Sequence, residues 1–233
     1  MRGKFIVIEG TDGSGKGTQT ALLAQRIKKS GHDIETIAFP RHGELSAKLV
    51  DLYLNGFFGD ATKVDPRFVS SFYAIDRLLN KERIEDWLNY GRVVIGDRYT
   101  TSNIGHQGAK VDDPEERERL FNWVYKMEFE EMGLPQPDLM LFLHIPTPIA
   151  MQLIEKKKQR EYIKSSNKDA HEGSESHLRG AETSYLHAAK LFKWEVIECV
   201  KDDKLLSIEE VNDKIWDKVS QILPFKKQSK IKM

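Results

Sequence analysis

The stretch that decides the fold is FIVIEGTDGSGKGT, residues 5–18. Residues 5–9 form an apolar, partly β-branched run that ends at a glycine, which is typical of a strand buried on both faces. The loop that follows has the spacing glycine, four residues, glycine and lysine, except that Gly17 stands where Ser or Thr is usual. Between a strand and a helix, such a loop turns its backbone N–H groups toward phosphate oxygens. The stretch therefore predicts a nucleotide phosphate site formed by Gly10, Gly13, Ser14, Gly15, Lys16, Gly17 and Thr18.

Outward from this loop, strands and helices alternate along the chain. Apolar runs predict further strands at residues 34–40, 92–96, 138–145 and 194–200. Helical spacing predicts a helix from Lys16, one long helix from Pro66 through Leu88, and helices at 183–192 and 207–223. Parallel strands need helical crossovers, so the alternation predicts an α/β protein: a three-layer P-loop NTPase fold with a five-stranded parallel sheet flanked by helices.

The bulk composition limits the class of protein. Lys plus Arg and Asp plus Glu are 36 each among 233 residues, so no bulk charge favours nucleic acid or a membrane surface as a partner. The single cysteine, Cys199, excludes an internal disulfide framework, and the N-terminal apolar run is too short for a signal sequence. We expect one cytoplasmic domain over residues 1–223, followed by a frayed basic tail at 224–233.

One segment breaks the alternation. Residues 156–168 carry six basic side chains and one acid, Glu161. This run predicts either a basic lid at approximately 156–172 or a solvated charged surface.

Three short groups of residues are candidates for substrate contacts: two follow predicted strands, and one lies on the predicted helix from Pro66. Ligands of open α/β sheets bind beyond the carboxyl ends of the strands, where Asp97 and Arg98 are placed. Asp97 is suited to hold metal-bound water and Arg98 to grip a phosphate, although a structural ion pair is the alternative. Phe39 offers an aromatic face at the end of the second strand. Tyr73 and Arg77 are four residues apart and share a helix face, where a ring can stack on a base, or simply pack in the core.

The phosphate loop alone does not distinguish switch GTPases from kinases. A switch GTPase needs a base-reading Asn-Lys-x-Asp, which is absent, and an Asp-x-x-Gly, which occurs only inside the loop at residues 12–15. The arginines at the strand ends favour a small-molecule kinase. A P-loop protein that binds nucleotide without catalysis is the rival from another class.

Five pieces of the sequence, in this order, resemble the thymidylate kinases of the nucleoside monophosphate kinase group: IEGTDGSGKGTQ, FPR, FYAIDR, GDRYTTSNIGHQGAK and PDLMLFLHIP. The resemblance covers residues 5 to about 192. It implies phosphoryl transfer from ATP to dTMP with Mg²⁺, a place in dTTP biosynthesis, and a homodimer. Another nucleoside monophosphate kinase, acting on dUMP, UMP or CMP, is the alternative. The Lys-Gly-Thr of the loop is similar to that of adenylate kinases, so Gly17 has a precedent.

The resemblance also implies roles for individual residues. Asp12 would lie near the acceptor's 3′-hydroxyl and the transferred phosphate, and Arg41 and Arg98 would hold the acceptor's 5′-phosphate. Tyr73 would stack on the base and Arg77 would bond its edge. His106 stands where relatives place Tyr or Phe against the deoxyribose, which weakens the expectation of strict deoxy selectivity. The substrate site implied in this way comprises Asp12, Phe39, Arg41, Tyr73, Arg77, Arg98, Asn103, His106 and Gln107.

Family members carry an arginine that stabilises the charge on the transferred phosphoryl group. In some members this arginine is in the phosphate loop, and in others it is on the lid. Because the loop position is Gly13 here, the resemblance implies a lid residue, with Arg160 as first choice and Lys164 or Lys168 as helpers. The catalytic set is then Asp12, Lys16, Arg98 and Arg160. Candidate metal contacts are Asp97 through water, Thr18, and Glu172, which with Asp169 has the spacing of lid acids in some relatives.

Overall fold

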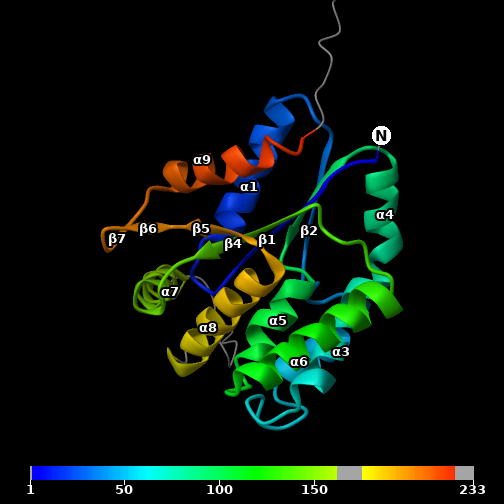
Figure 1. The fold of residues 1–233 in the computed structure, drawn as a ribbon, viewed down its shortest axis with the longest axis vertical. Coiled ribbons are helices and arrows are strands. Elements are labelled where there is room, and N and C mark those ends of the chain that lie inside the picture. The colour runs from blue at the N-terminus through cyan, green and yellow to red at the C-terminus, as the bar shows by residue number, and fades with distance from the viewer. Residues whose placement is uncertain (1, 162–174, 224–233) are drawn as a thin grey trace, which may run out of the picture.

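The computed structural model describes residues 2–161 and 175–223, and the side chains of residues 157–161 are outside this description. Its centre is a five-stranded sheet of β1 (Phe5–Gly10), β2 (Ile34–Ala38), β3 (Val93–Asp97), β4 (Leu139–His144) and β5 (Glu195–Glu198). The strand order is β2-β3-β1-β4-β5, and every pairing is parallel (Figure 1). The predicted fold class is thereby confirmed.

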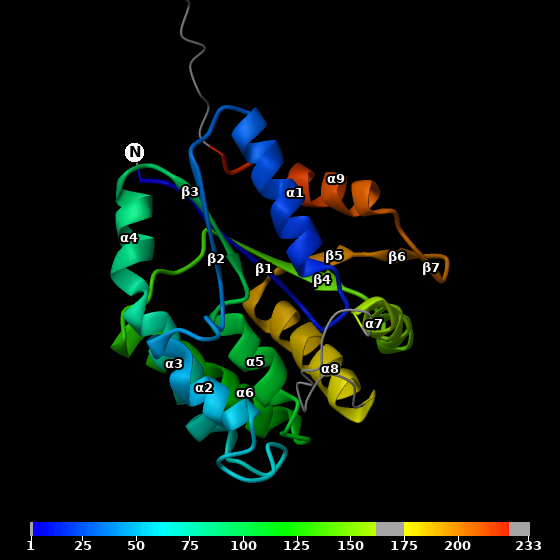
Figure 2. The same cartoon turned by 180° about the vertical axis from the view of Figure 1, so that it is seen from behind.

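The two faces of the sheet bury alternate residues of the same strands. Ile6 and Ile8 face α1 (Lys16–Lys29) and α9 (Ile208–Val219), where they pack with Leu23, Ile27 and Ile215. Phe5 and Val7 face the other way and pack with residues of α4 (Lys81–Asn89). On that same side Phe142 packs with Tyr185 of α8 (Glu175–Phe192). Figures 1 and 2 show α1 and α9 on one side of the sheet and α4 and α8 on the other, which gives three layers.

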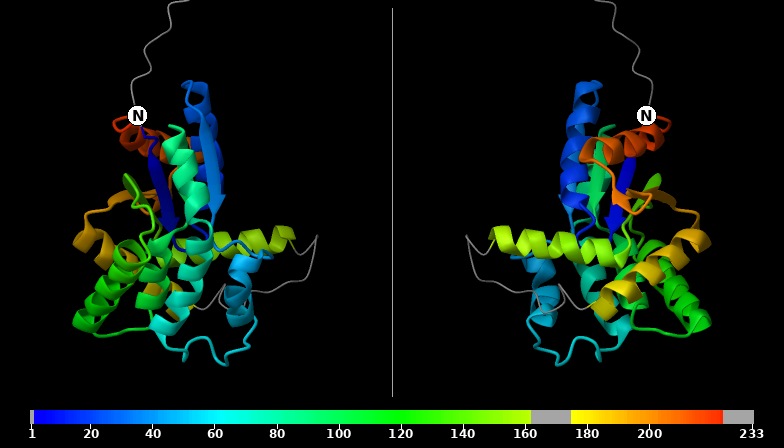
Figure 3. Two further views of the ribbon diagram at one scale, coloured as in Figure 1. Left: turned by 90° about the vertical axis from the view of Figure 1, so that its right-hand side faces the viewer. Right: turned by 90° about the vertical axis from the view of Figure 1, so that its left-hand side faces the viewer.

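The remaining elements surround the carboxyl ends of the strands. They are η1 (Leu45–Ala47), α2 (Lys48–Leu54), α3 (Pro66–Leu79), α5 (Thr100–Gly108), α6 (Pro114–Tyr125), the π-helical segment η2 (Lys126–Glu131), α7 (Thr147–Glu161), β6 (Val200–Lys201) and β7 (Lys204–Leu205). Figure 3 shows α7 projecting sideways at the level where the strands end. Of the lid expected at 156–172, residues 162–172 lie outside the described part of the chain, as does the tail at 224–233.

The prediction of one helix from Pro66 through Leu88 is wrong, because two helices, α3 and α4, divide at Asn80. The Nδ2 of Asn80 donates to the carbonyl oxygen of Asp76 at 2.8 Å, and its backbone N–H bonds Arg77. An asparagine that binds the backbone in this way competes with the helical hydrogen bonds and ends the helix. The predicted start at Pro66 is confirmed, and the side chain of Asp65 caps α3.

Candidate active site

The loop after β1 forms an anion cradle at the N-terminus of α1. Gly13 and Gly15 adopt left-handed φ values of 83° and 81°, which L side chains rarely adopt. Gly15 caps α1 without a side chain, and the first bond into the helix runs from the Gln19 amide to the Gly15 carbonyl oxygen. The amides of residues 16–18 are therefore left for a ligand, in the field of the helix dipole.

Gly13 lies beneath α7, with no space for a side chain. A Cβ built there would lie 2.8 Å from the carbonyl oxygen of Ala150 and 3.0 Å from Cγ1 of Ile154. An arginine at this position would have to displace α7. The structure thus gives a steric reason why the loop carries no catalytic arginine.

Lys16 is buried and folds back over the cradle. Its Nζ donates to the carbonyl oxygens of Gly10 and Thr11, both at 2.8 Å. Burial, followed by repulsion from Arg98, lowers the pKa of Lys16 to about 8. A bound phosphate would supply the negative charge that favours the ammonium form.

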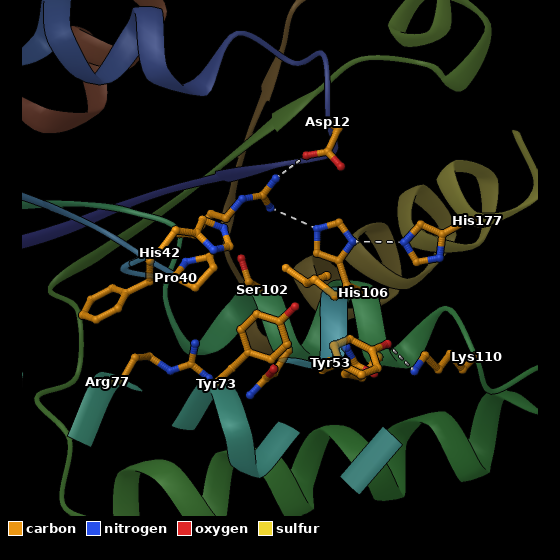
Figure 4. A pocket seen from close by; sticks show the side chains of 15 residues that line it. Asp12, Pro40, His42, Tyr53, Tyr73, Arg77, Ser102, His106, Lys110 and His177 are labelled. Carbon is orange, nitrogen blue, oxygen red and sulfur yellow. Dashed lines mark hydrogen bonds and ion pairs between the residues drawn. The ribbon is translucent and has the colours of Figure 1, made fainter. Parts of the chain in front are cut away.

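Two cavities lie at this end of the sheet, one over the cradle and one beside α5, and a row of polar side chains runs from the cradle into the one beside α5. Asp12 pairs with the guanidinium of Arg98, whose Nη1 bonds Nε2 of His106 at 3.0 Å, and His106 Nδ1 lies 3.4 Å from Nε2 of His177 (Figure 4). Burial lowers the pKa of His106 well below its usual value, and Arg98 lowers it further. The imidazole is therefore neutral at pH 7. Since Arg98 donates to Nε2, the proton of His106 lies on Nδ1 and is donated to His177.

Asp12 remains ionised in this row. Burial alone would raise the pKa of Asp12, but Arg98 and then Lys16 outweigh this effect and lower it. Arg98 itself has a left-handed φ of 66°, which is unfavourable for a residue with a side chain. The next residue holds it in place, because the backbone N–H of Tyr99 donates to the buried Glu9 at 2.9 Å.

The second cavity, which we call the acceptor cavity, has a volume of about 230 Å³. All of the expected substrate residues except Arg41 line it: Asp12, Phe39, Tyr73, Arg77, Arg98, Asn103, His106 and Gln107. Gln107 Oε1 is buried there without a hydrogen-bond partner among the described residues, so it can accept a hydrogen bond from a ligand in the cavity. Sequence reasoning missed the other lining residues: Pro40, His42, Tyr53, Leu54, Ser102, Lys110 and His177.

Arg41 does not line the acceptor cavity. Its Nη2 lies 3.4 Å from Glu44, and its backbone N–H donates to Asp76 at 2.8 Å. The neighbouring His42 lines the cavity instead. The expected phosphate contact of Arg41 thus requires a different side-chain position from the one in this structure.

The first cavity, which we call the nucleotide cavity, extends from the cradle over an apolar wall. Its volume is about 770 Å³, and Asp12 and Arg98 line it as well as the acceptor cavity. Residues 12–19 form its polar end, while Leu153, Ile154, Leu206, Ile208 and Val211 form its apolar end. Such a division suits a nucleotide, with phosphates on the loop and a base against the aliphatic side chains.

Asp97 and Thr18 are the expected metal contacts that fall within the described residues, and both line the nucleotide cavity. Burial raises the pKa of Asp97, with Lys16 and Arg98 acting in the opposite direction. The described residues contain no group of three or more His, Cys, Asp or Glu suited to a metal. A single carboxylate beside a phosphate cradle fits Mg²⁺, which takes its other ligands from phosphate oxygens and water. Glu172, Asp169, Lys164 and Lys168 lie outside the described residues, and so does the side chain of Arg160, whose backbone belongs to α7.

None of the described helices is long and apolar enough to cross a membrane.

Comparisons of the sequence and of the structure with known proteins all find thymidylate kinases. The family model described as "Thymidylate kinase" matches residues 8–215. A thymidylate kinase of Mycobacterium tuberculosis is 31% identical over 158 residues, which cover 67% of this chain and 73% of that protein. One from Schizosaccharomyces pombe is 29% identical over 221 residues, covering 95% of this chain and 93% of the relative. The solved thymidylate kinase of Candida albicans superimposes with a TM-score of 0.69 at 25% identity, covering 94% of this chain and 92% of that one.

Proposed function

This chain belongs to the thymidylate kinase family, and we propose that it transfers the terminal phosphoryl group of ATP to dTMP where its two cavities meet, giving dTDP and ADP. The observation that carries the proposal is that Asp12 and Arg98 line both cavities. A nucleotide on the loop and a monophosphate in the acceptor cavity would therefore bring their phosphates together at these two side chains. Phosphoryl transfer needs such positioning and charge neutralisation more than covalent chemistry.

Each residue of the junction has a defined task in this proposal. Lys16, held over the loop by two carbonyl oxygens, moves its ammonium onto the terminal phosphates of ATP. Arg98 leaves its pair with Asp12 to hold the acceptor phosphate in two hydrogen bonds. Asp12 is then released to accept a hydrogen bond from the acceptor's sugar hydroxyl. The loop amides and Lys16 neutralise charge on the donor, so the phosphoryl group moves directly between the nucleotides.

The lid is proposed to supply a further cation. Because α7 covers Gly13 and ends at Glu161, Arg160 belongs to the helix that closes over the phosphate loop. We assign Arg160 to the charge on the moving phosphoryl group, with Lys164 and Lys168 as helpers. A closed lid also excludes water and so prevents hydrolysis of ATP.

Mg²⁺ is proposed as the cofactor, held by Asp97 through water and by Thr18, with Glu172 as a further contact. When bound, it would neutralise the negative charge that develops on the phosphate oxygens during the transfer. The role of the chain is to keep Asp97 beside the loop: a Cβ at Gly17 would be only 3.8 Å from its Oδ2.

A homodimer in the cytoplasm completes the proposal. Phe68, Ile75 and Leu79 are spaced along one face of α3, and Phe68 and Leu79 are 50% and 65% exposed. An apolar stripe of this kind suits a helix that packs against a second copy of the chain. Size-exclusion chromatography with light scattering would measure the mass; a monomer at micromolar concentration would refute this part.

The decisive experiment is a panel of acceptors. The purified chain is assayed for ADP release with ATP and each of dTMP, dUMP, UMP, CMP and AMP. We expect the highest kcat/KM for dTMP. A tenfold preference for another monophosphate would overturn the substrate, and tight ATP binding without transfer to any of them would overturn the enzyme class.

A further inference from the structure

A second buried carboxylate, Glu128 of η2, lies behind the wall of the acceptor cavity. It is fully buried and lines neither cavity. Its Oε2 accepts from Arg77 Nε at 2.6 Å and from Thr100 Oγ1 at 2.8 Å. Its Oε1 accepts from Arg77 Nη2 at 2.7 Å and from Asn103 Nδ2 at 2.9 Å. Since Arg77 and Asn103 both line the cavity, Glu128 holds two of its polar side chains from behind.

Only one orientation of the Asn103 amide suits these neighbours. Nδ2 donates to Glu128 and to the carbonyl oxygen of Ser70, both at 2.9 Å, which uses both of its protons. Turning the amide over would set Oδ1 against a carboxylate and a carbonyl, two groups that only accept. Asn103 therefore offers its Oδ1 to the cavity, and no described residue donates to that oxygen.

Arg77 presents the opposite polarity. A guanidinium has five N–H groups and no acceptor. Three of them bond Glu128 and the carbonyl oxygen of Tyr99, the latter at 3.3 Å. One N–H on each terminal nitrogen remains without a partner among the described residues. Because Arg77 and Asn103 bond the same oxygen of Glu128, the remaining donor and acceptor are neighbours. Figure 4 shows Arg77 at the end of the cavity away from Asp12.

We propose that Glu128 is a positioning residue that fixes the polarity of this wall and thereby selects pyrimidines with a carbonyl beside a ring N–H. This inference rests on the proposed function. Thymine and uracil carry O4 next to N3–H, which matches the donor of Arg77 and the acceptor of Asn103. Cytosine carries an amino donor next to a ring nitrogen that accepts, so both contacts are reversed. Arg77 and Asn103 do not contact the 5-methyl group in this arrangement, so these two side chains would accept dUMP as well as dTMP.

The test compares dTMP and dCMP as acceptors of the full-length enzyme with ATP. The wild-type chain should favour dTMP in kcat/KM by at least about a hundredfold, because a mispaired cytosine leaves buried polar groups unsatisfied. Glu128→Gln replaces one of the two acceptors that fix the Asn103 amide by an N–H₂ donor, so that only the Ser70 carbonyl oxygen still opposes the turned orientation. Glu128→Asp keeps the charge that the buried Arg77 needs, but withdraws the carboxylate by one methylene. Each should reduce the dTMP/dCMP ratio by at least about tenfold.

Thr100→Val is the matched control, because it removes another hydrogen bond from the same carboxylate without touching Asn103. It should keep the wild-type ratio even if overall activity falls, since a merely structural loss affects both substrates alike. A wild-type enzyme that uses dTMP and dCMP equally, or Glu128 variants that retain the wild-type ratio, would overturn the inference while leaving the kinase activity in place. Failure of both Glu128 variants to fold would make Glu128 a structural residue and also overturn it. A wild-type chain inactive with dTMP would instead refute the proposed function.

Discussion

Replacing Gly13 by alanine should destabilise the protein more than replacing Gly15 by alanine, although the two glycines have almost the same backbone conformation. Their φ values are 83° and 81°. An L side chain in this region costs about 1–2 kcal/mol, and the cost applies to both variants. At Gly15 the added Cβ meets no atom of the described residues within 4 Å, whereas at Gly13 it meets the carbonyl oxygen of Ala150 at 2.8 Å and Ile154 at 3.0 Å.

The clash should add a further penalty at Gly13 alone. Ala150 O is backbone within α7, so it moves only if the helix moves, and overpacking of this kind costs about 1–3 kcal/mol. We therefore expect the free energy of unfolding to fall by about 1–2 kcal/mol for Gly15→Ala and by about 2–5 kcal/mol for Gly13→Ala. Urea unfolding followed by circular dichroism measures both against the wild type. Equal losses for the two variants would refute the reasoning, because the contact with α7 would then carry no cost.

Three further predictions concern the site and its surroundings. Arg98→Ala should raise the KM for dTMP and lower kcat, reducing kcat/KM by about 10²–10³-fold, because the guanidinium serves both bound acceptor and transition state; unchanged steady-state kinetics would remove Arg98 from the site. Arg160→Ala should lower kcat by about a thousandfold with little change in dTMP affinity, and a silent variant would move this role to another cation. His144→Asn should destabilise the fold more at about pH 5.5 than at about pH 9. Burial opposes protonation of His144, but the hydrogen bonds that its ring nitrogens donate to Glu182 and Glu198 raise its pKa overall. Burial raises the pKa of Glu182, but hydrogen bonds from Thr147 and His144 outweigh this and lower it. The ion pair therefore stabilises the fold above the titration of Glu182 and is lost as the pH rises through the pKa of His144; equal destabilisation at the two pH values would contradict this.

The strands and the phosphate loop could be predicted from the sequence because their determinants are local. Buried parallel strands are continuous apolar runs, and the loop is recognised by glycine spacing within a few residues. Every predicted strand overlaps an observed one, with ends that differ by one or two residues. The long helix failed at Asn80, where a side-chain bond to the backbone overrides an uninterrupted apolar pattern.

Much of the candidate site depends on contacts that no local pattern contains. His177 is 71 residues from His106, and Glu128 is 51 residues from Arg77. In the sequence, Glu128 is one acid in the run KMEFEE, without a feature that separates it from Glu130 or Glu131. The residues that could be predicted are those that follow a strand directly or belong to a recognised motif. Residues that hold them in place come from other elements, and only the folded chain brings them together.

Two buried carboxylates hold the first turn of α5 from different sides. Glu9 of β1 accepts from the Tyr99 amide, from the hydroxyls of Thr101 and Ser102, and from Tyr185. Glu128 accepts from Thr100 and Asn103. Acidic groups at a helix N-terminus are favoured by its dipole, and here each buried oxygen also has hydrogen-bond donors. Arg98 lies two residues before this helix, and Asn103, His106 and Gln107 lie within it, so one helix carries several of the side chains that line the acceptor cavity. A misplacement of about 1 Å costs on the order of a hundredfold in rate. The hydrogen bonds from the start of α5 to Glu9 and Glu128 therefore also serve to keep the geometry of the acceptor cavity.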